Sequence, residues 1–477
     1  MAMQPQLQPQ VQPHVQQQTH QPQQRIGPAP NISFSRKPGG VDLGEFEGGR
    51  LIVQGWDPSR GPTNLRGNLA NRLPGLGLLL LEEMDEFIQA HGATVPPVPE
   101  LPELYLVGVP DRDLFGAIGR ILADQVLAPE IGRIEPDVVL SLSKPPAQLG
   151  TNFDLFAAGT SHTNYVADIN ASGAHSIGVT GKGVRIAVVD SGVDVGILTT
   201  SFTDLWQSTN TGYVDSVGHG TAMISIIQAV APDAEIFAIR ITDSGLVHLW
   251  DVMAGVKVAT FDPAVEADIV NLSLGCHQVN RNCSVCGGQG DNRSIVFGSY
   301  LDTIRMLGRV PGNPDPVFVA AVGNDSQAHE FEWPARYTST VAIGSVDHAL
   351  QLSSFSHAAT QKSEYCLCPG GEWNNLTAKA TEWVGEGQSG GKPTHCVGTS
   401  AATAYASAIL ALYRQHFQNG LQQAGSSSAL ASVQLLDEAY NRCSQNISPN
   451  YDALLHGKGR LVFDPTPYQA PATSTGV

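Results

Sequence analysis

Residues 184–194 read VRIAVVDSGVD, and this stretch decides the fold class. The run from Val184 to Val189 is almost entirely apolar, and it ends at Asp190, which Ser191 and Gly192 follow. A strand of this kind is typical of a parallel sheet that helices cover on both faces. Ligands of such sheets collect beyond the carboxyl ends of the strands, which favours a functional carboxylate at 190. An acidic residue that only caps the next turn would show the same pattern.

Strands alternate with helices over the remainder of this region, from residue 176 to residue 465. This alternation predicts a three-layer α/β fold around a mostly parallel central sheet. The expected strands are 184–189, 235–241, 268–274, 317–322 and 341–346, and the expected helices are 219–228, 247–260, 295–307 and 400–417.

The chain before residue 176 divides into three parts by composition. Residues 1–45 are rich in Gln, Pro and Gly, which predicts a disordered tail. Residues 46–143 predict a small α+β domain, and residues 144–175 a linker. Residues 466–477 predict a loose C-terminal tail. Within the small domain we expect strands at 51–54, 104–109 and 133–142 and helices at 78–91 and 114–128.

The formal net charge of the 477-residue chain is −17, which argues against a general affinity for nucleic acid or for an anionic membrane. The most apolar short run, Leu76–Leu81, is far shorter than the roughly 20 residues that a membrane span needs. The first residues have neither a basic start nor an apolar core, so they do not resemble a secretory signal. The sequence therefore favours a cytoplasmic location.

Two further segments carry residues suited to chemistry. In the first, Gly218 and Gly220 flank His219, which precedes an apolar helix and could transfer protons. In the second, Ser400 follows Gly398 and opens a helix of small residues, where the helix dipole favours developing negative charge. A histidine at a helix start without a function, or a serine that only caps a helix, would fit each segment taken alone.

Taken together, the three segments resemble the motifs of the subtilisin-like serine peptidases. VRIAVVDSGVD resembles the aspartate motif of that family, GHGTAMISII the histidine motif and VGTSAATA the serine motif, in the same order. The resemblance implies a subtilisin-like fold and a serine endopeptidase with Asp190, His219 and Ser400 as its catalytic triad.

Two other segments resemble the family between these motifs. VFVAAVGND at 317–325 is similar to the strand and loop that carry the oxyanion asparagine, which implies that role for Asn324. A left-handed turn residue after Gly323 is the alternative. NLSLG at 271–275 resembles the strand that binds an extended polypeptide substrate, which implies substrate-binding roles for Ser273, Leu274 and Gly275. Glycine at 275 is expected to leave room for a substrate side chain.

The sequence also departs from the family pattern. Ala401 and Ala404 replace the bulky residue and the proline that usually follow the nucleophile, and unusual loops occupy 276–292 and 361–396. These departures motivate an alternative in which the chain is an inactive subtilisin-like scaffold that binds peptides. An intact set of Asp190, His219, Ser400 and Asn324 argues against that alternative.

Part of the N-terminal domain also resembles a segment of this family. GRIEPDVVL at 132–140 is similar to the end of the inhibitory prodomains of this family. The resemblance implies a self-processed zymogen whose own N-terminal domain inhibits it, with the cut between Leu142 and Gly181. An accessory or partner-binding domain is the alternative.

Seven cysteines leave three interpretations open, namely reduced thiols, one to three disulfides, or a metal-organised module. Their spacing matches no standard zinc pattern, so no metal ligand is assigned. Acyl transfer needs no cofactor. Calcium often stabilises the family, but no calcium-binding loop is evident. The cysteines are Cys276, Cys283, Cys286, Cys366, Cys368, Cys396 and Cys443.

Overall fold

The computed structural model places the described residues in one compact unit. It describes residues 49–56, 63–142, 169–193, 203–207, 215, 217–276, 294–324, 331–347, 349–358, 365–369, 375–376, 394–395, 398–423 and 430–468. The predicted tail at 1–45, the linker up to residue 168 and the C-terminal residues after 468 lie outside these ranges. Within the described part of the chain, no helix is both long enough and apolar enough to span a membrane.

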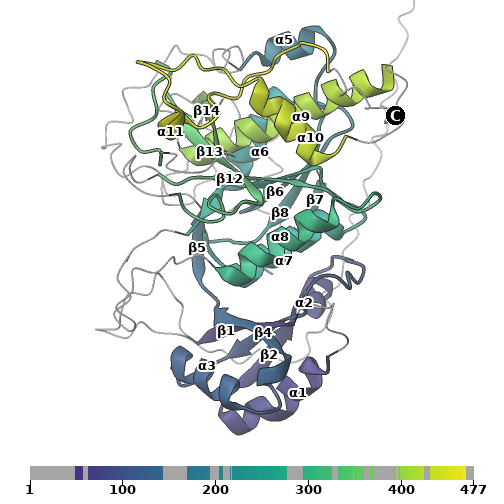
Figure 1. Ribbon diagram of the computed structural model, residues 1–477, viewed down its shortest axis with the longest axis vertical. Coiled ribbons are helices and arrows are strands. Elements are labelled where there is room, and N and C mark those ends of the chain that lie inside the picture. Colours follow the sequence, from purple (N-terminus) through teal and green to yellow (C-terminus); the bar gives the residue numbers. More distant parts are fainter. Residues whose placement is uncertain are drawn as a thin grey trace, which may run out of the picture. The chain divides into compact units, whose positions relative to one another are not determined.

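The larger part of the structure is built on a seven-stranded sheet in which every pair of neighbours is parallel (Figure 1). The order β14-β13-β12-β10-β6-β8-β7 confirms the predicted mostly parallel sheet. The strands are β6 (Arg185–Asp190), β7 (Thr203–Gln207), β8 (Glu235–Arg240), β10 (Ile269–Leu272), β12 (Val317–Ala321), β13 (Thr340–Val346) and β14 (Tyr365–Pro369). The alternating pattern did not reveal β7 and β14.

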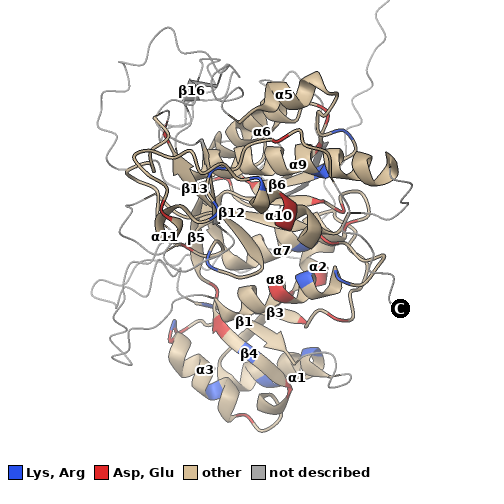
Figure 2. Cartoon of the chain, turned by 45° about the horizontal axis from the view of Figure 1, so that its top comes forward, with Lys and Arg blue, Asp and Glu red and all other residues tan. Residues whose placement is uncertain are grey.

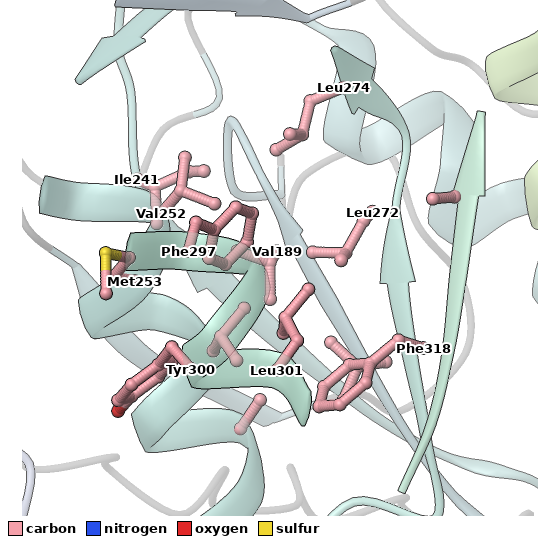
Figure 3. Close-up of a cluster of buried hydrophobic side chains, with 14 of the residues drawn as sticks. Val189, Ile241, Val252, Met253, Leu272, Leu274, Phe297, Tyr300, Leu301 and Phe318 are labelled. Carbon is pink, nitrogen blue, oxygen red and sulfur yellow. The ribbon is translucent and has the colours of Figure 1, made fainter. Parts of the chain in front are cut away.

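Helices cover both faces of this sheet, as the apolar strands require. On one face α6 (His219–Val230) and α9 (Thr399–Gln423) form a buried cluster with Ile186 and Val319. On the other face α7 (Leu249–Phe261) and α8 (Ile295–Leu307) do the same with Val189 and Leu272, as Figure 3 shows. The remaining helices here are α5 (Ala171–Ser176), α10 (Ser432–Asn441) and α11 (Ala453–His456).

Residues 49–142 form an N-terminal lobe around a four-stranded sheet of order β2-β3-β1-β4. Side chains on β1 alternate between its faces. Leu51 and Val53 join the lobe's own cluster, whereas Ile52 joins the cluster that contains Trp250 of α7. The elements are β1 (Arg50–Gly55), α1 (Leu65–Arg72), a 3₁₀ turn (Leu73–Leu76), β2 (Leu79–Glu83), α2 (Met84–Ala90), β3 (Leu104–Gly108), α3 (Leu114–Ala123), a 3₁₀ turn (Ala128–Glu130) and β4 (Ile131–Pro136).

Two predicted elements of this lobe were wrong. The helix expected at 78–91 is the strand β2 followed by the short helix α2, because Leu79 pairs with Gly108 at the sheet edge. The strand expected at 133–142 is two strands, β4 and β5 (Val139–Leu142). β4 ends at Pro136, which has no amide hydrogen to continue a ladder. β5 leaves the lobe's sheet for a different one.

Charged groups join the N-terminal lobe to the two helices on its side of the main sheet. Glu135 accepts hydrogen bonds from the Ile295 and Val296 amides, 3.1 and 3.3 Å away, at the start of α8. Asp137 accepts one from the Trp250 amide, 2.9 Å away, at the start of α7. Figure 2 shows acidic and basic residues together where α2 approaches α7. The lobe therefore caps both helices with carboxylates, which their dipoles favour.

Candidate functional site

Asp190 and His219 lie together at the carboxyl end of the central strand β6. Asp190 is the last residue of that strand, and His219 is the first residue of α6. The Nδ1 atom of His219 is 2.8 Å from Asp190 Oδ1 and 2.9 Å from Oδ2, and neither side chain is exposed to solvent. Because a carboxylate only accepts hydrogen bonds, Nδ1 carries the proton, which leaves Nε2 as the basic nitrogen of the neutral ring.

Two residues that were not singled out in the sequence hold this histidine in place. Asp215 is buried and accepts hydrogen bonds from the amides of Gly218 (2.7 Å) and Thr221 (2.9 Å) on both sides of His219. Burial raises the pKa of Asp215, although these donors act in the opposite direction. Ser191 Oγ accepts from the Gly220 amide at 2.9 Å. An acidic residue four positions before the histidine is the signal that could have pointed to Asp215.

Glycine is required at position 220 by a close approach of two backbone segments. A Cβ atom built there would lie 2.3 Å from the carbonyl oxygen of Gly192, much closer than atoms tolerate. The start of α6 can therefore pack directly against the turn that follows Asp190, which brings the imidazole to the carboxylate.

Ser400 is the second residue of α9 and is almost completely buried. Its Oγ donates a hydrogen bond to the carbonyl oxygen of Ser273, 3.2 Å away. In return, the Ser273 hydroxyl lies 3.1 Å from the carbonyl oxygen of Ser400 and 2.9 Å from Asn271 Oδ1. The structure thus joins the predicted nucleophile to the strand predicted to bind substrate, and α9 packs beside α6, which carries His219.

Asn324 follows β12 and is held in one orientation by Thr399. Its Oδ1 atom accepts from the amide (2.8 Å) and the hydroxyl (2.9 Å) of Thr399, so its Nδ2 atom points the other way. That nitrogen would lie 3.0 Å from a Cβ atom built on Gly398, whose φ is +138°. Only glycine fits there, and it lets the amide donor approach the residue that precedes Thr399 and Ser400.

The predicted substrate strand is already paired within the chain. β11 (Leu274–Gly275), β5 and β9 (Leu246–His248) form a three-stranded antiparallel sheet with β5 in the middle. Leu142 of β5 lies opposite Leu274, and its amide donates to the carbonyl oxygen of Gly245 at 2.9 Å. The end of the N-terminal lobe thus occupies the slot between β11 and β9 and runs toward Ser273.

The space beside Gly275 differs from the expectation that it is empty. A Cβ atom at this position would lie 2.0 Å from Oε2 of Glu332, a residue that is only 7% exposed. The room that glycine leaves is therefore taken up by a buried carboxylate.

Four of the seven cysteines fall within the described residues, and Cys283, Cys286 and Cys396 lie outside them. Cys366 on β14 and Cys443 after α10 have their sulfur atoms 3.7 Å apart, without a disulfide bond. Burial raises the pKa of the Cys366 and Cys368 thiols well above the ordinary value. The described part of the chain contains no group of three or more His, Cys, Asp or Glu residues arranged to hold a metal ion.

Comparison with known proteins agrees with this arrangement. A model of the subtilase family matches residues 181–441, more than half of the chain. Minor extracellular protease Epr of Bacillus subtilis is 28% identical over 322 residues, which are 62% of this chain and 43% of that protein. Subtilisin E of the same organism is 28% identical over 249 residues, 46% of this chain and 58% of that protein. The matches thus span less than two thirds of the length of these two relatives. Because the family model covers more than half of the chain and includes the described site, the chain belongs to the subtilase family.

Proposed function

We propose that this protein is a serine endopeptidase in which Ser400 is the nucleophile, His219 the general base and Asp190 the residue that orients His219. The observation that carries the proposal is the buried Asp190–His219 pair at the carboxyl end of β6. Asp190 fixes the tautomer that leaves Nε2 as a proton acceptor and stabilises the imidazolium that forms. This chemistry requires no metal or organic cofactor.

In the proposed mechanism, Ser400 Oγ attacks the carbonyl carbon of a peptide bond while His219 accepts its proton. His219 then gives this proton to the leaving amine, and water hydrolyses the acyl-enzyme by the same steps. The single hydroxyl proton of Ser400 is directed at the Ser273 carbonyl oxygen, so the side chain must rotate before His219 can accept the proton. The amide group of Asn324 and the backbone amide of Ser400 would donate to the oxyanion.

The proposed substrate is an extended polypeptide that enters between β11 and β9 as a middle strand. β5 lies in this slot with antiparallel pairing on both sides, which supports binding by strand addition. We propose further that the N-terminal lobe is an inhibitory prodomain, and that β5 blocks the slot until the chain cleaves itself. β5 ends at Leu142 opposite Leu274, and Ser273 directly precedes Leu274, so the cut is expected shortly after Leu142.

A peptide-binding scaffold without activity is the second candidate, because the slot holds a strand whether or not the bond after it is cleaved. One experiment separates the peptidase from the inactive scaffold. Purified wild-type protein is compared with Ser400→Ala and with Ser176→Ala, which changes an exposed serine on α5. Intact mass, N-terminal sequencing and labelling by a fluorophosphonate are measured for all three.

We expect the wild type and Ser176→Ala to lose the segment that ends near Leu142 and to react with the fluorophosphonate. Ser400→Ala should stay full length and unlabelled, because removal of the nucleophile in subtilisin, a member of the same family, lowers kcat by about 10⁶. Full-length, unlabelled wild-type protein that still binds peptides would favour the scaffold. Labelling of Ser400→Ala would show that another residue is the nucleophile.

A further inference from the structure

Glu332 is a buried acidic residue whose carboxylate lies between two glycines of the candidate site. A Cβ atom on Gly275 would be 2.0 Å from its Oε2, and one on Gly323 would be 3.0 Å from its Cδ. The backbone fixes this position at both ends, since the Glu332 amide donates to Val322 O at 3.0 Å and the next residue, Trp333, accepts from the Cys276 amide at 3.0 Å. The backbone that carries the carboxylate is therefore held on both sides.

The two glycines also border the place where a substrate carbonyl would be attacked. Gly275 ends the strand that pairs with β5, and Gly323 directly precedes Asn324. A substrate strand that follows the register of β5 would place the residue after the one opposite Leu274 across from Ser273, whose carbonyl oxygen accepts a hydrogen bond from the Ser400 hydroxyl. That substrate residue would present its carbonyl to Ser400 and Asn324, and its side chain would extend toward the Glu332 carboxylate.

The surroundings of the Glu332 carboxylate are polar as well as buried. A Cβ atom on Gly323 would also lie 2.5 Å from Cε1 of His357, whose side chain is buried and faces the same space. A carboxylate that has been removed from water interacts strongly with a cation that reaches it. A guanidinium or an ammonium group adds charge-assisted hydrogen bonds to such a carboxylate, whereas an apolar side chain adds none.

We infer that Glu332 determines substrate specificity, and that the residue whose carbonyl is attacked carries a positively charged side chain, arginine or lysine. This inference rests on the proposed function, because it assigns a preference to the same site. Glu332 takes no part in the chemical steps; it binds the substrate side chain next to the bond that is cleaved.

The test uses the self-processed protein and peptide substrates that differ only at the attacked residue. Arginine is compared with citrulline, which has the same shape without the charge, and lysine with norleucine. Active sites are counted by fluorophosphonate labelling. We expect kcat/KM for the charged substrates to exceed that for their neutral counterparts at least about 30-fold, as for other buried charge pairs. In Glu332→Gln this ratio should fall close to one, while norleucine peptides are cleaved much as before.

Glu235→Gln, which changes an exposed acidic residue at the start of β8 and is retained after processing, is the matched control and should keep the wild-type ratio. If Glu332→Gln does not fold, inhibition of the wild type by benzamidine, compared with uncharged benzamide, gives the same information. Labelled enzyme with equal kcat/KM for charged and neutral substrates, or with equal inhibition by the two compounds, overturns this inference and leaves the peptidase intact. Protein that is neither labelled nor active overturns the proposed function as well.

Discussion

At the scale of single residues, the orientation of Asn324 allows a sharp prediction. Thr399 binds its Oδ1 atom, so the amide nitrogen is the part directed at the site. In subtilisin, of the same family, loss of such a donor lowers kcat by about 10²–10³. We expect a loss of this order in kcat for Asn324→Ala, with KM little changed, because the donor acts mainly on charge that develops in the transition state.

Thr399→Val should lower kcat less than Asn324→Ala does. It removes the hydroxyl donor to Asn324 but keeps the amide donor, so the asparagine should stay nearly in place. A hydrogen bond of this kind contributes about 1 kcal/mol, which corresponds to roughly fivefold in kcat. Steady-state kinetics on both variants, with melting temperatures to exclude unfolding, test the assignment. If Asn324→Ala raised KM by a comparable factor and left kcat unchanged, the residue would only bind substrate.

The residues that could be predicted from the sequence are those with a local signature. Asp190 ends an apolar strand, His219 directly follows Gly218 at the start of a helix, and Ser400 comes two positions after Gly398 at the start of another. Glu332 has no such signature, because its role comes from contacts with Gly275 and Gly323 that only the folded chain creates. The same folding reversed the expectation for Gly275, whose open side accommodates a carboxylate.

At the scale of elements, the carboxylate of Glu135 at the start of α8 is expected to stabilise the junction between the N-terminal lobe and the main sheet. It accepts from two amides and from the Ser294 hydroxyl. Burial raises its pKa, and these donors oppose that change. Glu135→Gln places an amide group among donors, so we expect the free energy of unfolding to fall by about 1–2 kcal/mol.

This measurement is made by urea unfolding in the Ser400→Ala background, which keeps the chain in one piece. Glu100→Gln in the same background removes an exposed acidic group of the same lobe and should leave the free energy of unfolding unchanged. If both substitutions had the same effect, the loss would reflect the net charge of the lobe and not the cap.

The elements that were predicted wrongly have patterns that fit two structures. Leu78–His91 is an apolar run followed by acidic residues, which suits one helix. Pairing of Leu79 with Gly108 keeps its first part extended, and Glu83 then caps α2 by accepting from the Glu86 amide at 2.9 Å. β5 was merged with β4 for a related reason, because its partners β9 and β11 lie more than a hundred positions along the chain.

At the scale of the whole molecule, one cluster of charges links β5 and its lobe to the main sheet and makes their contact depend on pH. His248 Nδ1 is 3.3 Å from Oδ2 of Asp137, which also pairs with Arg50. Burial would lower the pKa of His248, but the hydrogen bond and charge of Asp137 outweigh it and raise the pKa above 6.5. Asp251 acts in the same direction and Arg50 opposes it.

The lowered pKa of Asp137 keeps the carboxylate of the Asp137–His248 pair charged over the neutral range. Burial would raise this pKa, but Arg50 and His248 lower it from 3.8 to about 2. Its contribution to stability is therefore present above pH 3.8 and is lost only as the pH falls toward 2. Over the neutral range, the state of the pair is set by His248.

Because the pKa of His248 is raised in the folded protein, its contribution is fully present below pH 6.5 and is lost as the pH rises through the raised value. We expect the difference in free energy of unfolding between Ser400→Ala and Ser400→Ala/His248→Gln to be largest near pH 5.5 and to shrink toward pH 8.5. Urea unfolding across this range measures it, with His416→Gln on α9 as the control. A difference that stays constant with pH would mean that His248 contributes by packing alone, and a difference that grows with pH would contradict the direction of its pKa shift.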